Sequence, residues 1–179
     1  MRMICMFAVI CLVAGCGSSI QIDNDYDPDA NFSSYKTYDW IPQQATATGN
    51  AQQAEISNTL LDKRIKEAVN LQLSREGVTR SSNSPDLLVA YHAGIENKVD
   101  VTDWGYSYGS YYYGYPRRDV TVYQYQKGTL IVDLIEASSQ ELVWRGSAQA
   151  TLLDNPTPEK VAERINSAVG KMFNKYPPK

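Results

Sequence analysis

The sequence predicts an α+β fold, a two-layer domain in which one antiparallel sheet carries two amphipathic helices on one face. Three observations support this prediction. Short segments that alternate apolar and polar residues, as strands do, recur along the chain. Two longer segments repeat apolar residues every three or four positions, as helices do. With 179 residues, of which 43% are hydrophobic, the chain has the size of one domain.

Two strands are predicted before the first helix. Residues 20–22, Ile-Gln-Ile, alternate in polarity, and the turn residues Asp27-Pro28-Asp29 follow them. Residues 35–40, Tyr-Lys-Thr-Tyr-Asp-Trp, also alternate and are rich in strand-forming residues, and Pro42 ends the segment. Residues 43–50 lack an apolar stripe and are interpreted as a surface loop.

Residues 51–75 are predicted to form the first helix. Ser57 or Asn58 could cap its better-patterned part, and Gly77 suits the position just past its end. The apolar side chains on one face of this helix are Leu61, Ile65, Ala68, Val69 and Leu73.

Four further strands and a second helix follow. The strands are predicted at residues 86–97, 120–126, 129–135 and 142–152, and the last two are joined by a turn at 137–140. Across this hairpin, Asp133 is expected to pair with Arg145. Thr157 can cap the second helix, and Pro158 suits its first position. The apolar stripe of this helix is Val161, Ile165, Ala168, Val169 and Met172.

The N-terminal residues have the features of a signal peptide. Arg2 precedes an apolar run at 4–13, whose length as a helix is about 15 Å, half of a bilayer's hydrocarbon core. The run ends in Val13-Ala14-Gly15-Cys16, which resembles the lipobox of bacterial lipoprotein precursors. The alternative is an ordinary secretory signal with a chance cysteine.

The lipobox resemblance implies how the chain is processed and where it is located. Residues 1–15 are removed, and Cys16 carries fatty acyl chains such as palmitate. Residues 16–19 form a short tether, and residues 20–179 form one domain. Gly17 replaces the aspartate that retains lipoproteins in the inner membrane, so the resemblance implies an outer-membrane anchor with the domain facing the periplasm.

Composition limits the possible partners and cofactors. The formal net charge is −3 and the sequence pI is about 5.2, which argues against a nucleic-acid binder. Cys5 and Cys11 lie in the predicted leader, so Cys16 is the only cysteine in the remaining chain. An internal disulfide, a thiol nucleophile and a cysteine metal site are therefore excluded. We expect the protein to bind the membrane through its acyl chains, because a net-negative domain gains nothing from anionic lipid head groups.

Few residues point to catalysis. His92 is the only histidine, and it falls in a predicted strand. No hydrolase, phosphate-binding or zinc-binding motif is present, and the acidic residues 23–27 lack the glycine and glutamate of a calcium loop. Asp86 and Asp133 could still meet in space as a carboxylate pair. We expect no enzyme activity, no metal and no cofactor, and a periplasmic hydrolase is the least favoured alternative.

The most unusual segment is rich in tyrosine and glycine. Residues 104–115 read Trp-Gly-Tyr-Ser-Tyr-Gly-Ser-Tyr-Tyr-Tyr-Gly-Tyr, and two arginines follow. Tyrosine combines an apolar ring with a polar tip, which suits contacts with sugars or peptides. Three interpretations remain open: a self-packed hairpin tip, a protein-docking surface, or a site for peptidoglycan or another glycan. The candidate binding residues are Trp104, Tyr106, Tyr108, Tyr111, Tyr112, Tyr113, Tyr115, Arg117 and Arg118.

Four segments together are similar to a known family. They are residues 125–134, with Gly-Thr-Leu-Ile-Val-Asp, residues 142–148, with Leu-Val-Trp-Arg-Gly, and residues 35–40 and 84–89. The chain thus resembles domain-of-unknown-function family 4136, a family of bacterial envelope lipoproteins. The resemblance implies a periplasm-facing α+β lipoprotein without an established activity or catalytic residues. Our leading hypothesis is a non-catalytic outer-membrane lipoprotein that acts in envelope structure or assembly through protein contacts.

Overall fold

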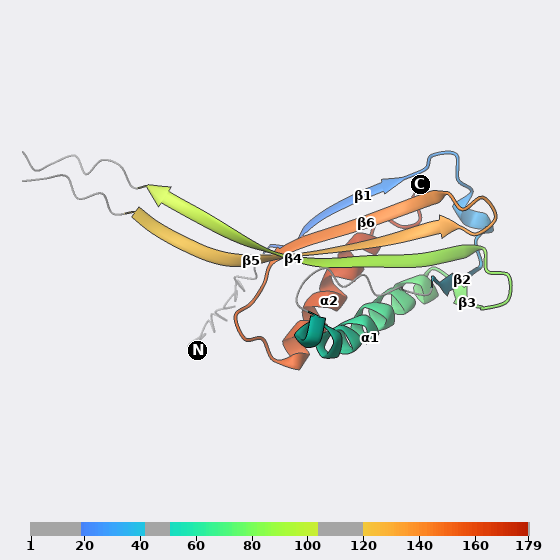
Figure 1. Cartoon of the computed structure of the whole chain (residues 1–179). Coiled ribbons are helices and arrows are strands. Elements are labelled where there is room, and N and C mark those ends of the chain that lie inside the picture. Colours follow the sequence, from blue (N-terminus) through green and yellow to red (C-terminus); the bar gives the residue numbers. More distant parts are fainter. Residues whose placement is uncertain (1–18, 42–50, 104–119, 179) are drawn as a thin grey trace, which may run out of the picture.

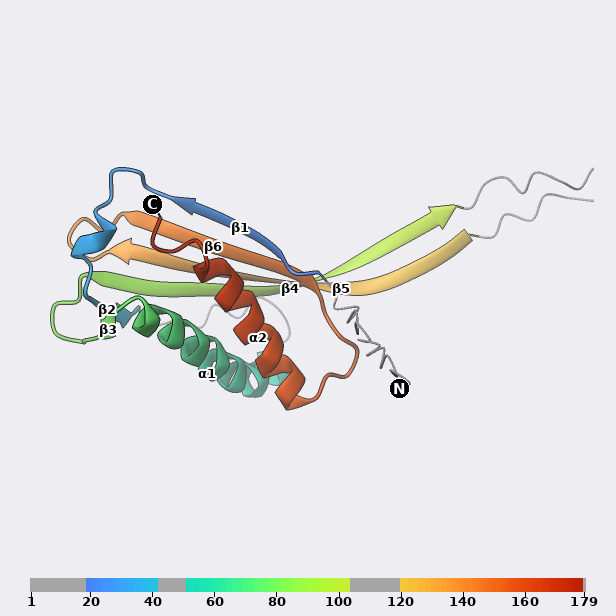
Figure 2. The same cartoon turned by 180° about the vertical axis from the view of Figure 1, so that it is seen from behind.

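The computed structural model describes residues 19–41, 51–103 and 120–178 (Figure 1). Six strands form one sheet in the order β1-β6-β5-β4-β2-β3. In Figures 1 and 2, both helices lie on the same side of this sheet. The elements in chain order are β1 (Gln21–Tyr26), the 3-10 turn η1 (Phe32–Ser34), β2 (Thr37–Trp40), α1 (Ala51–Arg75), β3 (Thr79–Arg80), β4 (Leu87–Asp103), β5 (Val120–Glu136), β6 (Leu142–Thr151) and α2 (Pro158–Phe173).

The α+β class is confirmed, but the prediction of a purely antiparallel sheet is wrong. β1, β6, β5 and β4 pair antiparallel, whereas β2 pairs parallel with both β4 and β3. The reason is the connection between β2 and β4, which runs through the long helix α1. Helix α1 carries the chain back to the end of the sheet at which β2 began, so that β4 runs in the same direction as β2.

The predicted strands at 120–126 and 129–135 are a single strand, β5. Gly128, between the two predicted segments, lies inside β5 and opposite Ile95 of β4. A Cβ atom on Gly128 would lie 2.7 Å from Cδ2 of Leu152, so glycine here leaves room for that side chain. β4 is likewise longer than predicted and extends to Asp103. The two strands therefore form a hairpin that is much longer than the pattern indicated.

The core lies between the helices and the sheet. The predicted stripe of α1 is confirmed for Ile65, Ala68, Val69 and Leu73, which are buried, while Leu61 is half-buried and packs against the core. In α2, Val169 and Met172 are buried, together with Phe173, which the stripe did not include. The sheet contributes the buried residues Leu87, Val89 and Tyr91 from β4, Leu130, Val132 and Leu134 from β5, and Trp144 and Ala148 from β6.

An aromatic cluster closes the core at the end of α2. The ring of Trp144 lies 4.8 Å from that of Phe173 and 5.5 Å from that of Tyr176, measured between centroids. Phe32 packs edge-on against Tyr176 at 5.8 Å. Such aromatic pairs stabilise a core beyond their buried area, by about 0.5–1.5 kcal/mol each. The C-terminal segment after α2 is therefore part of the core.

The helix ends follow the sequence signals in part. Thr157 accepts a hydrogen bond from the backbone N–H of Lys160 at 3.4 Å, and Pro158 is the first residue of α2. Gly77, just past α1, has a φ of 77°, which glycine adopts without strain. α1 begins at Ala51, so Ser57 and Asn58 lie inside the helix and not at its cap.

Among the described residues, no helix is both long and apolar enough to span a membrane.

Candidate functional site

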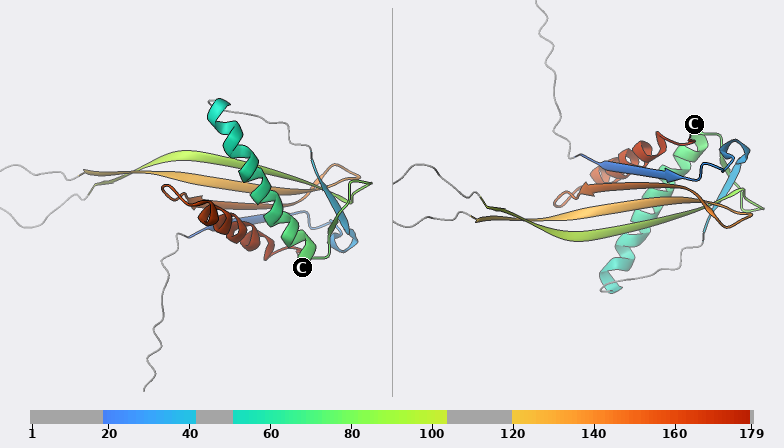
Figure 3. Two further views of the ribbon diagram at one scale, coloured as in Figure 1. Left: turned by 90° about the horizontal axis from the view of Figure 1, so that it is seen from below. Right: turned by 90° about the horizontal axis from the view of Figure 1, so that it is seen from above.

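The outer halves of β4 and β5 leave the body of the domain as a two-stranded ribbon (Figures 1 and 3). The two strands pair from Leu87 and Glu136 to Asp103 and Val120. β2 accompanies β4 only as far as Val89, and β6 accompanies β5 only as far as Lys127. We call residues 95–103 and 120–128 the arm, and the row where Gly94 pairs with Thr129 the arm root.

The sequence-predicted site residues lie outside the described part of the chain. This holds for Cys16 and for the whole candidate binding set: Trp104, Tyr106, Tyr108, Tyr111, Tyr112, Tyr113, Tyr115, Arg117 and Arg118. The structure does show how their segment is attached. Residues 104–119 connect Asp103 to Val120, which are register partners at the outer end of the arm.

The two faces of the arm differ in charge. On one face, Ile95, Asn97 and Val99 of β4 lie opposite Gly128, Gln126 and Gln124 of β5, and none of them is charged. Ile95 is 64% exposed and Val99 is 60% exposed. The amide of Gln126 donates a hydrogen bond to Asn97 Oδ1 at 3.1 Å, so the polar groups of this face are partly satisfied within it.

Glu96, Lys98 and Lys127 lie on the opposite face, whereas at the outer end Asp103 shares the face of Ile95 by alternation. Glu96 and Lys98 form an ion pair at 2.7 Å, and Lys127 lies opposite Glu96 in the register. Hydrogen bonding to Lys98 lowers the pKa of the Glu96 carboxyl, and the same contact raises the pKa of Lys98. Over residues 95–99 and 124–128 the arm is therefore an amphipathic ribbon, with an uncharged face and a charged face.

A pocket of about 690 Å³ lies at the arm root. Ile95 and Gln126, from the uncharged face of the arm, line it together with residues of both helices and of the segment before α2. The uncharged face is therefore continuous with the helix-covered side of the sheet. The other lining residues are Leu61, Leu152, Leu153, Asp154, Asn155, Pro156, Val161, Arg164 and Ile165. Arg164 donates a hydrogen bond to the backbone carbonyl of Thr151 at 2.7 Å.

The two carboxylates considered as a pair each have their own partners. Asp133 is 4% exposed and accepts two hydrogen bonds from Arg145, at 2.6 and 2.8 Å, as the hairpin pairing predicted. Asp86 accepts hydrogen bonds from the backbone N–H groups of Lys36 and Thr37 and from the Thr37 hydroxyl. The N–H of Lys36 is the main cause that lowers the pKa of Asp86, followed by the Thr37 hydroxyl. Both carboxylates thus hold the sheet together.

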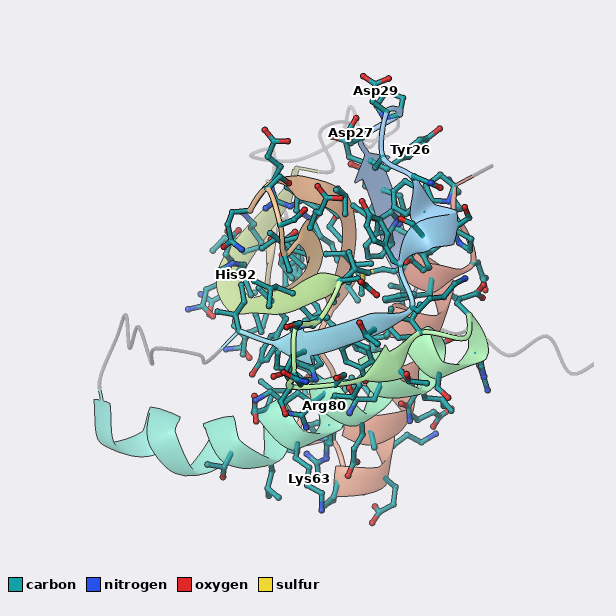
Figure 4. The ribbon with its side chains drawn as sticks, turned by 90° about the vertical axis from the view of Figure 1, so that its right-hand side faces the viewer. Tyr26, Asp27, Asp29, Lys63, Arg80 and His92 are labelled. Carbon is teal, nitrogen blue, oxygen red and sulfur yellow. The ribbon has the colours of Figure 1, made fainter. Side chains whose placement is uncertain are left out.

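His92 does not join a group of candidate catalytic residues. It is exposed, and its register partner in β5 is Ile131. Figure 4 shows His92 on a different side of the molecule from Asp27 and Asp29. Asp27 Oδ1 accepts a hydrogen bond from the N–H of Asp29 at 2.9 Å, which is an Asx turn. Within the described ranges, no three His, Cys, Asp or Glu residues are grouped so that they could hold a metal ion.

Two tyrosines with raised pKa values belong to the core. Burial raises the pKa of Tyr35 to about 12, and its hydroxyl also donates a hydrogen bond to Glu136 at 3.0 Å. Burial likewise raises the pKa of Tyr176 to about 12. Both rings pack against Phe32. We therefore assign them to stability and not to chemistry.

Sequence reasoning missed the uncharged face of the arm. The signal was present in the alternation of residues 95–99, where Ile95, Asn97 and Val99 are uncharged and the residues between them are Glu96 and Lys98. Residues 124–128 repeat it, since Gln124, Gln126 and Gly128 are separated by Tyr125 and Lys127. The alternation identifies a two-faced strand, but it does not show that the strand extends beyond the body.

The fold and the candidate site define a class: a small α+β domain with a projecting β-arm and carboxylates that are engaged in structural hydrogen bonds. The chain belongs to the family described as Domain of unknown function (DUF4136), whose model matches residues 22–178. The family predicted from the sequence is thus confirmed.

Comparison with solved structures adds a shared fold. The crystal structure of a PDZ domain protein from Parabacteroides distasonis has 16% sequence identity and a TM-score of 0.56, and the match covers 90% of this chain and 37% of that chain. The present chain therefore spans well under half of that protein. The PelC dodecamer from Paraburkholderia phytofirmans has 12% identity and a TM-score of 0.46, with 87% and 95% of the two chains covered. Among curated proteins, the search found no match.

Proposed function

We propose that this protein is a non-catalytic, lipid-anchored lipoprotein of the bacterial outer membrane, whose two-layer domain faces the periplasm. We further propose that it acts in envelope structure or assembly by docking another envelope protein through residues 104–118. The observation that carries the proposal is the arm. It supports the Tyr/Gly-rich segment at the end of a ribbon about 26 Å long, since strands rise about 3.3 Å per residue.

The arm favours a contact role because it adds little to the core. In the described residues, the β4 edge of the arm pairs with no other strand and the β5 edge pairs with β6 only at Lys127 and Gly128, and the side chains of Ile95 and Val99 are largely exposed. Exposed apolar and aromatic side chains are typical of surfaces that bind a partner. The structural hydrogen bonds of Asp86 and Asp133 support a non-catalytic role.

The anchor is supported by the sequence Val13-Ala14-Gly15-Cys16 and by the closeness of Cys16 to the domain. β1 begins at Gln21, so an extended chain from Cys16 reaches at most about 17 Å. Replacing Cys16 with serine should release the protein from the membrane fraction. Its persistence there, with the domain folded, would contradict the anchor.

Photocrosslinking in living cells tests the docking role. A photoreactive residue at Tyr112 should give one discrete adduct, which mass spectrometry identifies. The matched control is the same residue at Glu67, whose side chain is 63% exposed on α1, and it should give no such adduct. Loss of sedimentation with purified sacculi on Tyr112→Ser, with no protein adduct, would instead favour the alternative of a peptidoglycan or glycan site.

A further inference from the structure

The start of the domain lies at the arm root. Gln21, the first residue of β1, pairs with Gln149 of β6, which pairs with Thr129 of β5, which pairs with Gly94 of β4. This row crosses the sheet at the level where the arm leaves the body. The chain therefore enters the domain at the same end from which the arm projects.

The lengths of the tether and of the arm restrict how the domain sits on a membrane. From Gln21 back to Cys16, the chain spans at most about 17 Å. The arm extends about 26 Å beyond the same level, from Ile95 to Asp103. If Cys16 is lipidated, as we propose above, the tether is shorter than the arm.

Two upright orientations are excluded on this basis. With the arm pointing away from the membrane, the body from Gly94 to Leu87, about 23 Å long, would lie between Gln21 and the lipid, which the tether does not span. With the arm pointing into the membrane, the unpaired edges of two strands and the charges of Glu96 and Lys98 would enter hydrocarbon. Both are strongly unfavourable.

We propose that the arm lies along the surface of the bilayer that holds the lipid anchor, with the uncharged face of residues 95–99 and 124–128 against the lipid. Val99 then enters the interface, while Glu96 and Lys98 stay in water. Asn97, Gln124 and Gln126 are uncharged amides, which the interfacial region accepts more readily than ions. The partner of the protein is then one held at the same membrane surface.

The twist of the arm is compatible with this contact. In Figure 1, β4 lies below β5 in the body and above it in the arm, so the ribbon twists between the two parts. Such twist is largest in two-stranded ribbons. At the pocket, the uncharged face points toward the helices. Because the ribbon twists, this face points in another direction farther out along the arm. There the helices do not separate it from the lipid.

The test uses the full acylated protein in vesicles of phosphatidylethanolamine and phosphatidylglycerol. Because Cys16 is the only cysteine after residue 15 and is acylated, one introduced cysteine can be labelled selectively. The variants are Val99→Cys on the uncharged face, Lys98→Cys on the charged face, and Ser82→Cys at the far end of the body as a control. A fluorophore on each cysteine is exposed to quenchers attached to lipid acyl chains and to quenchers in water.

The proposal predicts that lipid-attached quenchers reduce the Val99 signal severalfold more than the Lys98 or Ser82 signal. Equal, water-like quenching at Val99 and Lys98 in protein that is acylated and vesicle-bound would overturn the arm contact and leave the anchor intact. Val99 labels that are shielded from both quenchers, with crosslinks between Val99→Cys copies, would overturn it in favour of a second copy. Mass spectra without acylation would instead contradict the proposed function.

Discussion

The inner and outer halves of β4 and β5 differ in almost every respect except their hydrogen-bonded pairing. In the body, Val89 and Val132 are fully buried, and neighbouring strands and helices cover them. In the arm, Val99 is mostly exposed, and beyond Lys127 the two described strands continue without a third partner. A two-stranded ribbon gains little stability in water by itself. The body therefore supports the fold, whereas the arm adds little to its stability.

The largest expected difference between the two regions comes from side-chain truncation. Trp144→Ala should lower the free energy of unfolding by about 3–5 kcal/mol, because Trp144 fills the space against Phe173 and Tyr176. Val99→Ala in the arm should change it by less than about 0.5 kcal/mol. Urea unfolding followed by circular dichroism measures both. A loss at Val99 comparable to that at Trp144 would remove the distinction.

Two glycines allow the same comparison with one added methyl group. At Gly146, a Cβ would lie 2.5 Å from Cη2 of Trp144 and 3.1 Å from Cβ of Met172, so Gly146→Ala should cost about 1–3 kcal/mol by overpacking. At Gly94, a Cβ would have no heavy atom within 4 Å, and Gly94→Ala should be within about 0.5 kcal/mol of the parent. Thermal unfolding of the two variants side by side checks this. Equal effects would show that the arm root is packed as tightly as the core.

Two carboxylates with lowered pKa values extend the comparison of body and arm to substitutions with smaller effects on the unfolding free energy. Asp86→Asn should cost about 1–2 kcal/mol at neutral pH, because three donors bind the charged form of Asp86. A carboxyl whose pKa is lowered by folding contributes stability above its unfolded pKa of about 3.9, and this is lost as the pH falls through its folded pKa. The cost of Asp86→Asn should therefore shrink below about pH 4.

The matched arm variant for this pH series is Glu96→Gln. Its pKa is also lowered, by Lys98, but both side chains of that pair are in water. Glu96→Gln should give no measurable change in unfolding free energy at either pH. Unfolding titrations of both variants at neutral pH and about pH 3 make the measurement. A constant cost of Asp86→Asn across this range would contradict the assigned hydrogen bonds.

The sequence predicts the body better than the arm, for physical reasons. Helix stripes such as Ile65 and Leu73 are local patterns, and so is the cap at Thr157. The parallel pairing of Tyr38 with Leu87 depends on how a distant helix crosses the sheet, which no local pattern encodes. At Gly128, a glycine fits inside the strand because the side chain of Leu152 occupies the space of a Cβ atom. Leu152 directly follows β6, so this contact is not visible in the local sequence around Gly128.

The candidate site was predictable only in part. The aromatic segment at 104–115 is conspicuous in composition, and residues 104–119 lie outside the described residues, so its predicted role stays a prediction. The ribbon that carries it was not predicted, because alternation identifies two faces but not whether other strands continue beside them. That property depends on where β2 and β6 end, at Trp40 and Thr151.

Removal of the arm is the most direct test of the claim that the fold and the contact surface are separable. Residues 95–128 are replaced by Asn-Gly, which suits a two-residue turn between the paired residues Gly94 and Thr129. The account predicts a folded, membrane-anchored domain whose unfolding free energy is within about 1 kcal/mol of the full chain, and which no longer binds the partner captured at Tyr112. An unfolded product, or a shortened protein that still captures that partner, would contradict it.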